Sequence, residues 1–143
     1  MTKVIAEIGW NHMGDMDLAK KMIISAAQNG ADICKFQTWS EKNLKKGPWD
    51  NDGRRDIYKK AELSKDDHLY LIDECKKNNV DFLTSVFDIN SLDMLSEIGV
   101  KKIKIPSHEI NNSNLIKIAC ENFDEVIVSA GAANWDEIMS IKK

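Results

Sequence analysis

Few cysteines are present, and their spacing excludes two kinds of small scaffold. Cys34, Cys75 and Cys120 are odd in number, lie far apart and include no C-x-x-C pair. This argues against a disulfide framework and against a zinc knuckle. Because their sequence neighbours are mostly apolar, we expect three small, buried hydrophobic side chains. Lys35 beside Cys34 would suit a nucleophilic thiol, but adjacent strand residues point to opposite faces of a sheet.

The sequence also lacks long hydrophobic runs and a strong excess of one charge. No apolar stretch approaches the roughly 20 residues that span a bilayer. The N-terminus has no long apolar region followed by a cleavage site. We therefore expect a cytoplasmic chain with no membrane partner. The formal net charge is -3, so the sequence lacks the excess of positive charge that is typical of nucleic-acid-binding proteins, and nucleic acid is not an expected partner.

A repeated order of strand, loop and helix runs along the 143 residues. Strand-like apolar runs lie at residues 4–9, 32–37, 81–87, 101–106 and 126–131. Several are apolar at consecutive positions, which is typical of strands covered on both faces. Helical patterns lie between them and begin near Asp15, Ser64, Ser91, Ser113 and Asn134. Such a series predicts right-handed crossovers and a parallel sheet.

One connection, from residue 38 to residue 63, is much longer than the others and holds Trp39, Trp49 and Tyr58. Loops of this length in compact domains are functional or disordered. The aromatic side chains argue against disorder. In a βα-barrel this connection would sit on the active face, so we predict a lid or rim of the site.

Polar residues gather at the predicted carboxyl ends of the strands, where a βα-barrel builds its active site. In chain order they are Glu7, Asn11, Lys35, Gln37, Thr84, Ser85, Asp88, Lys104, Ser107, Glu109 and Ser129. Lys35 and Lys104 lie inside apolar strands, and burying an unpaired ammonium is costly. Each lysine therefore needs an anion. That anion is either an internal carboxylate, Glu7 or Glu109, or a bound phosphate or carboxylate, and the nearby hydroxyls favour the ligand.

The two glutamates of this set and two histidines near the same strand ends give weaker indications of function. Glu7 and Glu109 could bind sugar hydroxyls or move protons, or they could pair with the lysines. His12 and His108 lie at two strand ends. Two histidines without supporting ligands are a weak indication of a metal site.

Five segments of the chain form a specific combination: EIGWNHMGD at 7–15, KFQT at 35–38, FLTSVFD at 82–88, IKIPSHEI at 103–110 and SAGA at 129–132. Together they resemble the sialic acid synthase family. This family makes N-acetylneuraminate and related nonulosonates such as legionaminate and pseudaminate, and it includes spore-coat polysaccharide synthases. They follow the family order and spacing along nearly the whole chain.

The resemblance implies an α/β protein with a TIM-type (β/α) barrel. Residues 1–143 would form about the first five βα units, because such a barrel takes about 250 residues. The C-terminal half of the barrel and the family's antifreeze-like domain would be absent. Expected partners are therefore a second copy in a homodimer or the missing barrel half. We expect the chain alone to be inactive.

The resemblance also implies a reaction, the condensation of phosphoenolpyruvate with an N-acetylated amino sugar such as N-acetylmannosamine. The enol carbon attacks the sugar aldehyde, water adds to the resulting cation, and phosphate leaves by C–O cleavage. A divalent metal, manganese or magnesium, polarises the aldehyde. The metal ligands of the family would lie beyond Lys143.

Matched position by position, the family motifs assign roles to the strand-end residues. Lys35, Ser85, Lys104, Ser107 and Ser129 match phosphoenolpyruvate-binding positions. The carboxylates that face the sugar match Glu7 and Glu109. We predict that Glu7, Lys35, Lys104 and Glu109 are catalytic. The predicted substrate-binding residues are Asn11, Gln37, Thr84, Ser85, Asp88, Ser107 and Ser129.

Three departures from the family pattern concern which sugar the site would prefer. The chain has Ser85-Val86 in place of Thr-Pro, His108 in place of Gly, and SAGA at 129–132 in place of Ser-Thr-Gly-Met. None removes a lysine or a carboxylate. Two other functions stay open: another phosphoenolpyruvate-dependent deoxy-sugar-acid synthase of the same barrel superfamily, and a non-catalytic remnant that binds an anion or a partner chain.

Overall fold

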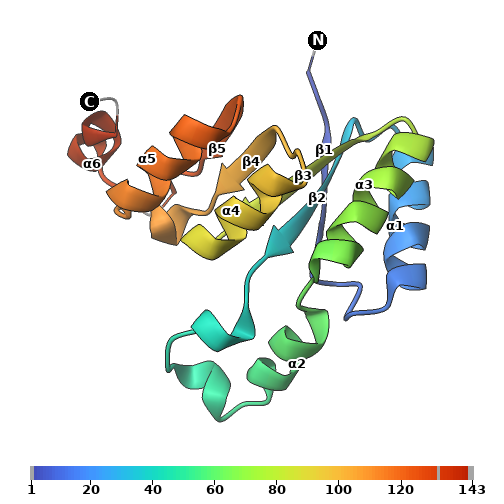
Figure 1. The fold of residues 1–143 in the computed structure, drawn as a ribbon, viewed down its shortest axis with the longest axis horizontal. Coiled ribbons are helices and arrows are strands. Elements are labelled where there is room, and N and C mark those ends of the chain that lie inside the picture. The colour runs from blue at the N-terminus through green and yellow to red at the C-terminus, as the bar shows by residue number, and fades with distance from the viewer. Residues whose placement is uncertain (1, 132, 142–143) are drawn as a thin grey trace. The chain divides into compact units, whose positions relative to one another are not determined.

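The computed structural model describes residues 2–131 and 133–141, and it alternates strands with helices (Figure 1). The strands are β1 (Ile5–Gly9), β2 (Ile33–Thr38), β3 (Asp81–Val86), β4 (Lys102–Ile105) and β5 (Glu125–Val128). They form one sheet in the order β1-β2-β3-β4-β5, and the pairs β1–β2, β3–β4 and β4–β5 are parallel. The five predicted strands and the parallel α/β fold are confirmed.

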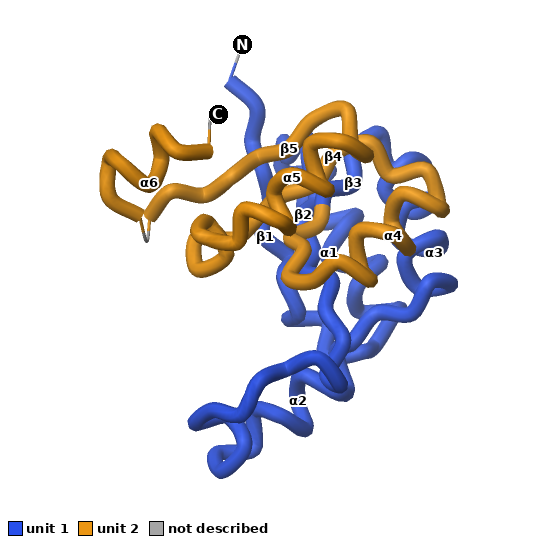
Figure 2. The backbone as a smooth tube through the Cα atoms, turned by 60° about the vertical axis from the view of Figure 1, so that its left-hand side comes forward, with its two compact units in different colours: residues 1–83 blue, residues 84–143 orange. Residues whose placement is uncertain are grey.

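The helices are α1 (Met16–Gln28), α2 (Arg54–Ala61), α3 (Lys65–Lys77), α4 (Ile89–Glu97), α5 (Ser113–Asn122) and α6 (Trp135–Ser140). Three short 3-10 helices are η1 (Glu41–Asn43), η2 (Pro48–Asp50) and η3 (Ser107–Glu109). None of the helices in the described part of the chain has the length and hydropathy of a bilayer-spanning segment. The chain divides into two compact units, residues 1–83 and 84–143 (Figure 2).

In the first unit, α1 and α3 lie side by side over one face of β1 and β2. Capping residues explain where these helices begin. The Asp15 carboxylate accepts from Leu18 N at 2.9 Å, and Ser64 forms a capping box with Asp67. The predicted starts of both helices are confirmed. Their apolar side chains join those of the strands in a core made of Ile8, Ala19, Ile23, Cys34, Phe36, Leu63, Leu71, Cys75 and Val80.

In the second unit, the helix starts differ slightly from the prediction. Asp88, not Ser91, caps α4, because its carboxylate accepts from the backbone and the hydroxyl of Ser91. Asn112, one residue before Ser113, caps α5. The start of α6 at Asn134 is confirmed, with a capping box to Glu137.

Two further expectations need correction. The long connection contains η1, η2 and α2, so it is a folded segment with a helix that was not predicted. Cys34 and Cys75 are buried as expected, but Cys120 is exposed near the end of α5. Cys120 lies in the last turn of α5, which ends at Asn122.

Candidate functional site

Glu7 and Lys35 form the centre of the site in the first unit. They are partners in the parallel register of β1 and β2, so their side chains leave the sheet on the same face. The Lys35 ammonium makes an ion pair with Glu7 Oε2. The lysine side chain is 7% exposed and the glutamate side chain 50% exposed. The predicted internal salt bridge of Lys35 is therefore with Glu7, and the pair opens to solvent through the carboxylate.

Gly9 lies beside this pair at an irregularity in β1. The register shifts between Glu7 and Gly9, so that Gly9 aligns with Phe36. Such bulges re-aim side chains near strand ends and often use a glycine with positive φ. Gly9 has φ +58. A Cβ built on it would lie 3.3 Å from Glu7 Oε1, 3.5 Å from Gln37 Nε2 and 3.7 Å from Asn11 Nδ2. Three predicted site residues thus converge on the space above this glycine.

The loop from β1 to α1 holds Asn11 in place through a series of tight turns. The Asn11 side chain donates to Ile8 O at 2.8 Å. His12 is fully buried, and its Nδ1 accepts from Gly14 N at 3.1 Å. This bond leaves the ring proton on Nε2, a buried atom without a hydrogen-bond partner. Burial lowers the pKa of His12, so the ring is neutral at pH 7.

A metal at the histidines receives no support. His108 is 63% exposed, its Nε2 is 3.9 Å from Glu109 Oε1, and its ring packs against Phe87 at 5.5 Å. Among residues 2–131 and 133–141, no group of three or more His, Cys, Asp or Glu side chains gathers to hold a metal ion. His12 is instead an internal support of the loop that carries Asn11.

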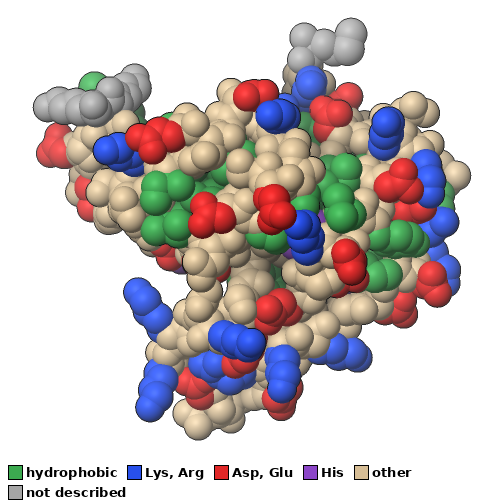
Figure 3. Space-filling model, viewed as in Figure 1, with side chains coloured by type: hydrophobic (Ala, Val, Ile, Leu, Met, Phe, Trp, Pro, Cys, Tyr) green, Lys and Arg blue, Asp and Glu red, His purple; other side chains and the backbone are tan. Residues whose placement is uncertain are grey.

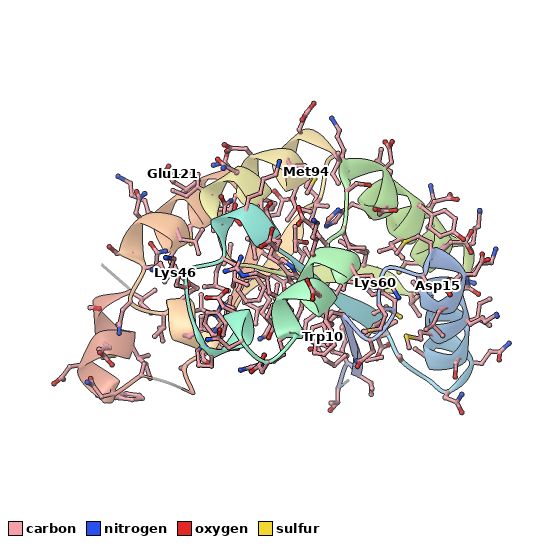
Figure 4. All side chains as sticks on the ribbon, turned by 90° about the horizontal axis from the view of Figure 1, so that it is seen from below. Trp10, Asp15, Lys46, Lys60, Met94 and Glu121 are labelled. Carbon is pink, nitrogen blue, oxygen red and sulfur yellow. The ribbon has the colours of Figure 1, made fainter. Side chains whose placement is uncertain are left out.

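Helix α2 packs against the same loop (Figure 4). Tyr58 lies between two tryptophans, with ring centroids 6.1 Å from Trp10 and 5.9 Å from Trp39. Trp39 Nε1 donates to Tyr58 O at 3.3 Å. At the end of α2, the Lys60 carbonyl occupies the place of a Gly14 side chain, since a Cβ there would lie 2.0 Å from its oxygen. The 39–64 segment is therefore a fixed rim beside the ends of β1 and β2.

A buried histidine joins the two ends of this segment. His68 in α3 donates through Nδ1 to Ser64 O at 2.7 Å, so its Nε2 accepts from the Thr38 hydroxyl at 2.8 Å. Burial lowers the pKa of His68, which favours this neutral tautomer. Thr38 ends β2, and Ser64 caps α3. His68 therefore links the end of β2 to the start of α3, the two points where the rim joins the rest of the unit.

The tip of the rim is held by Arg55. Its guanidinium pairs with Glu41 and Asp50 and donates to Leu44 O at 3.2 Å. These bonds connect η1, η2 and α2. Trp49 at the tip donates locally to Lys45 O at 2.8 Å.

The surface of the rim is basic (Figure 3). Several of its acidic side chains form ion pairs with its arginines. Asp52, for example, pairs with Arg54 at 2.7 Å. The exposed lysines of the rim make no ion pair within the described residues. They are Lys42, Lys45, Lys46, Lys59 and Lys60. A cationic rim raises the local concentration of an anionic substrate.

In the second unit, Lys104 and Ser85 are partners in the register of β3 and β4 and share a face of the sheet. Lys104 also aligns with Ile127 of β5. Ser129 N donates to Ile105 O at 3.0 Å, which places Ser129 at the carboxyl end of β4. Thr84 aligns with Ile103 and is fully buried, so it points to the opposite face from Ser85. A role for Thr84 in substrate binding stays a prediction, and its side chain leaves the sheet on the other face from Ser85.

Three other predicted residues of this unit lie in the loops after β3 and β4. The Asp88 carboxylate is engaged in capping α4, with Ser91 N at 2.9 Å. Glu109 Oε2 accepts from the Asn112 side chain at 2.9 Å, next to the start of α5. Ser107 begins η3 directly after β4. A role in substrate binding for Asp88, Ser107 and Glu109 stays a prediction.

The structure thus brings Glu7, Asn11, Lys35 and Gln37 together in one unit, and Ser85 with Lys104 in the other. Sequence reasoning missed Gly9 as part of the site. The sequence signal for Gly9 was a glycine at the end of a strand, between the carboxylate of Glu7 and the amide of Asn11.

Comparison with known proteins gives one consistent family. The model of the NeuB family matches residues 22–142. The chain is 41% identical over 148 residues to N,N'-diacetyllegionaminic acid synthase of Campylobacter jejuni, covering 96% of this chain and 44% of that protein. The chain spans less than half the length of the curated relatives it matches.

Solved structures agree with the sequence comparison. The fold superposes on N-acetylneuraminic acid (sialic acid) synthetase from Leptospira borgpetersenii, in complex with citrate, with a TM-score of 0.88 and 37% identity. The match covers 97% of this chain and 48% of that one. Spore coat polysaccharide biosynthesis protein spsE from Bacillus subtilis gives a TM-score of 0.80 at 32% identity, covering 97% and 38%. This chain belongs to the NeuB family.

Proposed function

We propose that this chain is the N-terminal portion of a nonulosonic acid synthase, which condenses phosphoenolpyruvate with an N-acetylated amino sugar. The observation that carries the proposal is the buried Lys35 ammonium paired with Glu7 at the ends of two parallel strands. A buried cation beside a solvent-open carboxylate suits a site for an anion and a polyhydroxyl partner. Membership of the NeuB family supports phosphoenolpyruvate and an N-acetylated amino sugar as the two substrates in this proposal.

The anion in this proposal is phosphoenolpyruvate, and the cations proposed for it are Lys35 in the first unit and Lys104 in the second. Ser85 supports this role as the strand partner of Lys104, since a hydroxyl adds a donor to an ammonium. Ser107 and Ser129 would add two further hydroxyls. The citrate in the Leptospira relative supports an anionic ligand in that protein.

The sugar in this proposal meets Glu7, Asn11 and Gln37. Their polar atoms converge above Gly9, and Glu7 is half exposed. Carboxylates and amides are suited to sugar hydroxyls, because together they accept and donate hydrogen bonds. The similarity to a diacetyllegionaminic acid synthase points to a sugar with two acetamido groups, since the condensation keeps the substituents of the sugar.

The manganese or magnesium of the family does not fit this chain alone. Within the described residues, too few ligand side chains gather to hold the ion. We propose that its ligands belong to the remaining part of the synthase, where the metal would polarise the aldehyde. The missing strands would also pair with the sheet and complete the barrel, either in one longer chain or as a partner, and a homodimer could form on that assembly.

The test is condensation by a chimera in which this chain replaces the matching part of the Leptospira synthetase. With phosphoenolpyruvate and manganese, we expect phosphate release that depends on N-acetylmannosamine or a diacetamido sugar. Release that depends on a phosphorylated aldose would favour the other deoxy-sugar-acid synthase. A folded chimera that releases no phosphate with any sugar would favour a non-catalytic remnant.

A further inference from the structure

Two buried thiols of the first unit take no part in the proposed reaction. Cys34 lies in β2 and is 0% exposed, and Cys75 lies near the end of α3 and is 1% exposed. Both belong to the hydrophobic core of this unit, and both are free cysteines. What this pair can do depends on how the two side chains lie relative to each other.

The strand and the helix bring the two thiols to one interface. Lys35 leaves the sheet towards Glu7, so Cys34, one residue earlier, points to the opposite face, which α1 and α3 cover. Leu71 and Cys75 lie one turn apart on the buried stripe of α3 that packs against the sheet. The thiols of Cys34 and Cys75 meet there in a side-chain hydrogen bond.

This hydrogen bond makes the two sulfur atoms chemically different. It lowers the pKa of Cys34, because the Cys75 thiol can donate to the Cys34 sulfur. The same bond, together with burial, raises the pKa of Cys75. A thiolate is the nucleophile in disulfide chemistry. Cys34 is therefore the attacking sulfur of the pair, and Cys75 is the thiol beside it that can complete a disulfide.

We propose that Cys34 and Cys75 are a redox-sensitive pair, which a low-molecular-weight disulfide converts to an intramolecular disulfide that ties α3 to β2. Residues 35–74, between the two cysteines, include the whole rim, so this bond would close a covalent loop around the rim. It would join the same two elements as the hydrogen bond between Thr38 and His68. This inference does not depend on the proposed function.

The reaction is thiol–disulfide exchange in two steps. The Cys34 thiolate attacks one sulfur of the small disulfide, whose S–S bond breaks as one thiolate leaves. The Cys75 sulfur then attacks the Cys34 sulfur of the mixed disulfide, forms the internal S–S bond and releases the second thiolate. The two cysteines lose two electrons and two protons, and the reagent is reduced to two thiols.

The experiment is an equilibrium oxidation of the Cys120→Ser chain in mixtures of reduced and oxidised glutathione. Cys120 is exposed, so its removal prevents disulfides between chains without a change in the core. Mass spectrometry after acid quenching gives the disulfide-bonded fraction, and peptide mapping without reduction locates the bond. The glutathione ratio at half oxidation gives the effective concentration of one thiol at the other. An equilibrium value does not depend on how quickly the reagent reaches buried thiols.

The same titration in urea that unfolds the chain provides the reference. We expect the effective concentration in the folded chain to be higher on the order of a hundredfold, because folding has already brought the two ends of the loop together. Cys75→Ala is the matched control, since it keeps the buried Cys34 and the exposed Cys120. This variant should show no gain on folding. Amide hydrogen exchange in α3 should slow at least tenfold in the oxidised Cys120→Ser chain.

Three results would overturn the proposal. The first is an effective concentration in the folded chain equal to or below the value in urea. The second is an equal gain on folding in Cys75→Ala, which would show that contact between Cys34 and Cys75 is not its cause. The third is unchanged hydrogen exchange in α3 after oxidation, which would show that the bond does not tie α3 to β2.

Discussion

Lys35 is buried and Glu7 is half exposed, although the two side chains form one ion pair across neighbouring strands. This asymmetry means that the two partners depend on each other unequally. Glu7 without Lys35 remains solvated by water. Lys35 without Glu7 loses a carboxylate in a place where water has little access.

Glu7→Gln should therefore destabilise the chain more than Lys35→Met. We expect a loss of about 1–3 kcal/mol for Glu7→Gln, below the usual cost of breaking a fully buried pair because the carboxylate is partly screened by solvent. Lys35→Met should cost less than about 1 kcal/mol, since it removes the buried charge. Urea unfolding of the two single variants and of the double variant gives their free energies of unfolding and tests this order. A larger loss for Lys35→Met would contradict the proposed asymmetry.

Arg55 should control the order of the rim. Arg55→Gln removes bonds to Glu41, Asp50 and Leu44, which connect η1, η2 and α2. We expect amide hydrogen exchange in residues 41–55 to rise roughly tenfold or more. Exchange in α1 should stay the same. Arg54→Gln is the comparison variant, because the ion pair of Arg54 is with the sequence neighbour Asp52 and its contact with the tip is a cation–π contact with Trp49, 6.0 Å from the ring centroid. Equal exchange in the two variants would show that Arg55 does not hold the tip.

The buried histidines should make stability depend on pH. Burial lowers the pKa of His12 and His68, so the unfolded chain binds more protons than the folded chain near and below the ordinary histidine pKa of about 6.5. Stability should be constant above that pH. It should fall as the pH drops through this value, by at most about 1.4 kcal/mol per pH unit for each histidine.

Urea unfolding between pH 8 and pH 5.5 measures this profile. His12→Asn keeps an acceptor near the position of Nδ1 but cannot be protonated, so it should flatten the profile. His108→Gln should leave the slope unchanged, because His108 is exposed. A stability that stays level or rises towards pH 5.5 would contradict the neutral, buried state of both rings.

The isolated chain should release no phosphate from phosphoenolpyruvate with N-acetylmannosamine and manganese. Its relatives are more than twice as long, and its described residues gather no metal site. A sheet with unpaired edge strands also invites association, so we expect oligomers. Light scattering and a phosphate assay check both expectations. Turnover by a clean monomer would show that the missing half contributes less than we propose.

Physical reasoning from the sequence anticipated the strands, most helix starts and the paired lysine. Lys35 stood out because a cation inside an apolar strand needs an anion, and Glu7 was one of two candidates for it. Choosing between Glu7 and Glu109 required the register of β1 and β2, which arises from the packing of the whole unit. The placement of Ser85 opposite Lys104 on one face of the sheet required the register of β3 and β4 for the same reason.

Two features left little trace in the sequence. Helix α2 has only Ile57 and Tyr58 as large apolar residues and starts after Gly53 without a side-chain cap. It therefore shows no clear 3.6-residue period, and contacts with Trp10 and Gly14 hold it in place. Gly9 was not predicted as part of the site because it has no side chain that could act chemically.

The most direct test of the proposed anion site is kcat/KM for phosphoenolpyruvate in the chimera, compared between Lys104→Met and Lys102→Met. Both lysines lie on β4 and, two residues apart, on the same face, but Lys102 is at the opposite end, where it pairs with Glu125 at 2.9 Å. We predict that Lys104→Met loses about 2–5 kcal/mol of transition-state stabilisation, roughly 30-fold or more in kcat/KM, while Lys102→Met stays near the wild type. Equal kcat/KM values in the two variants would contradict the account.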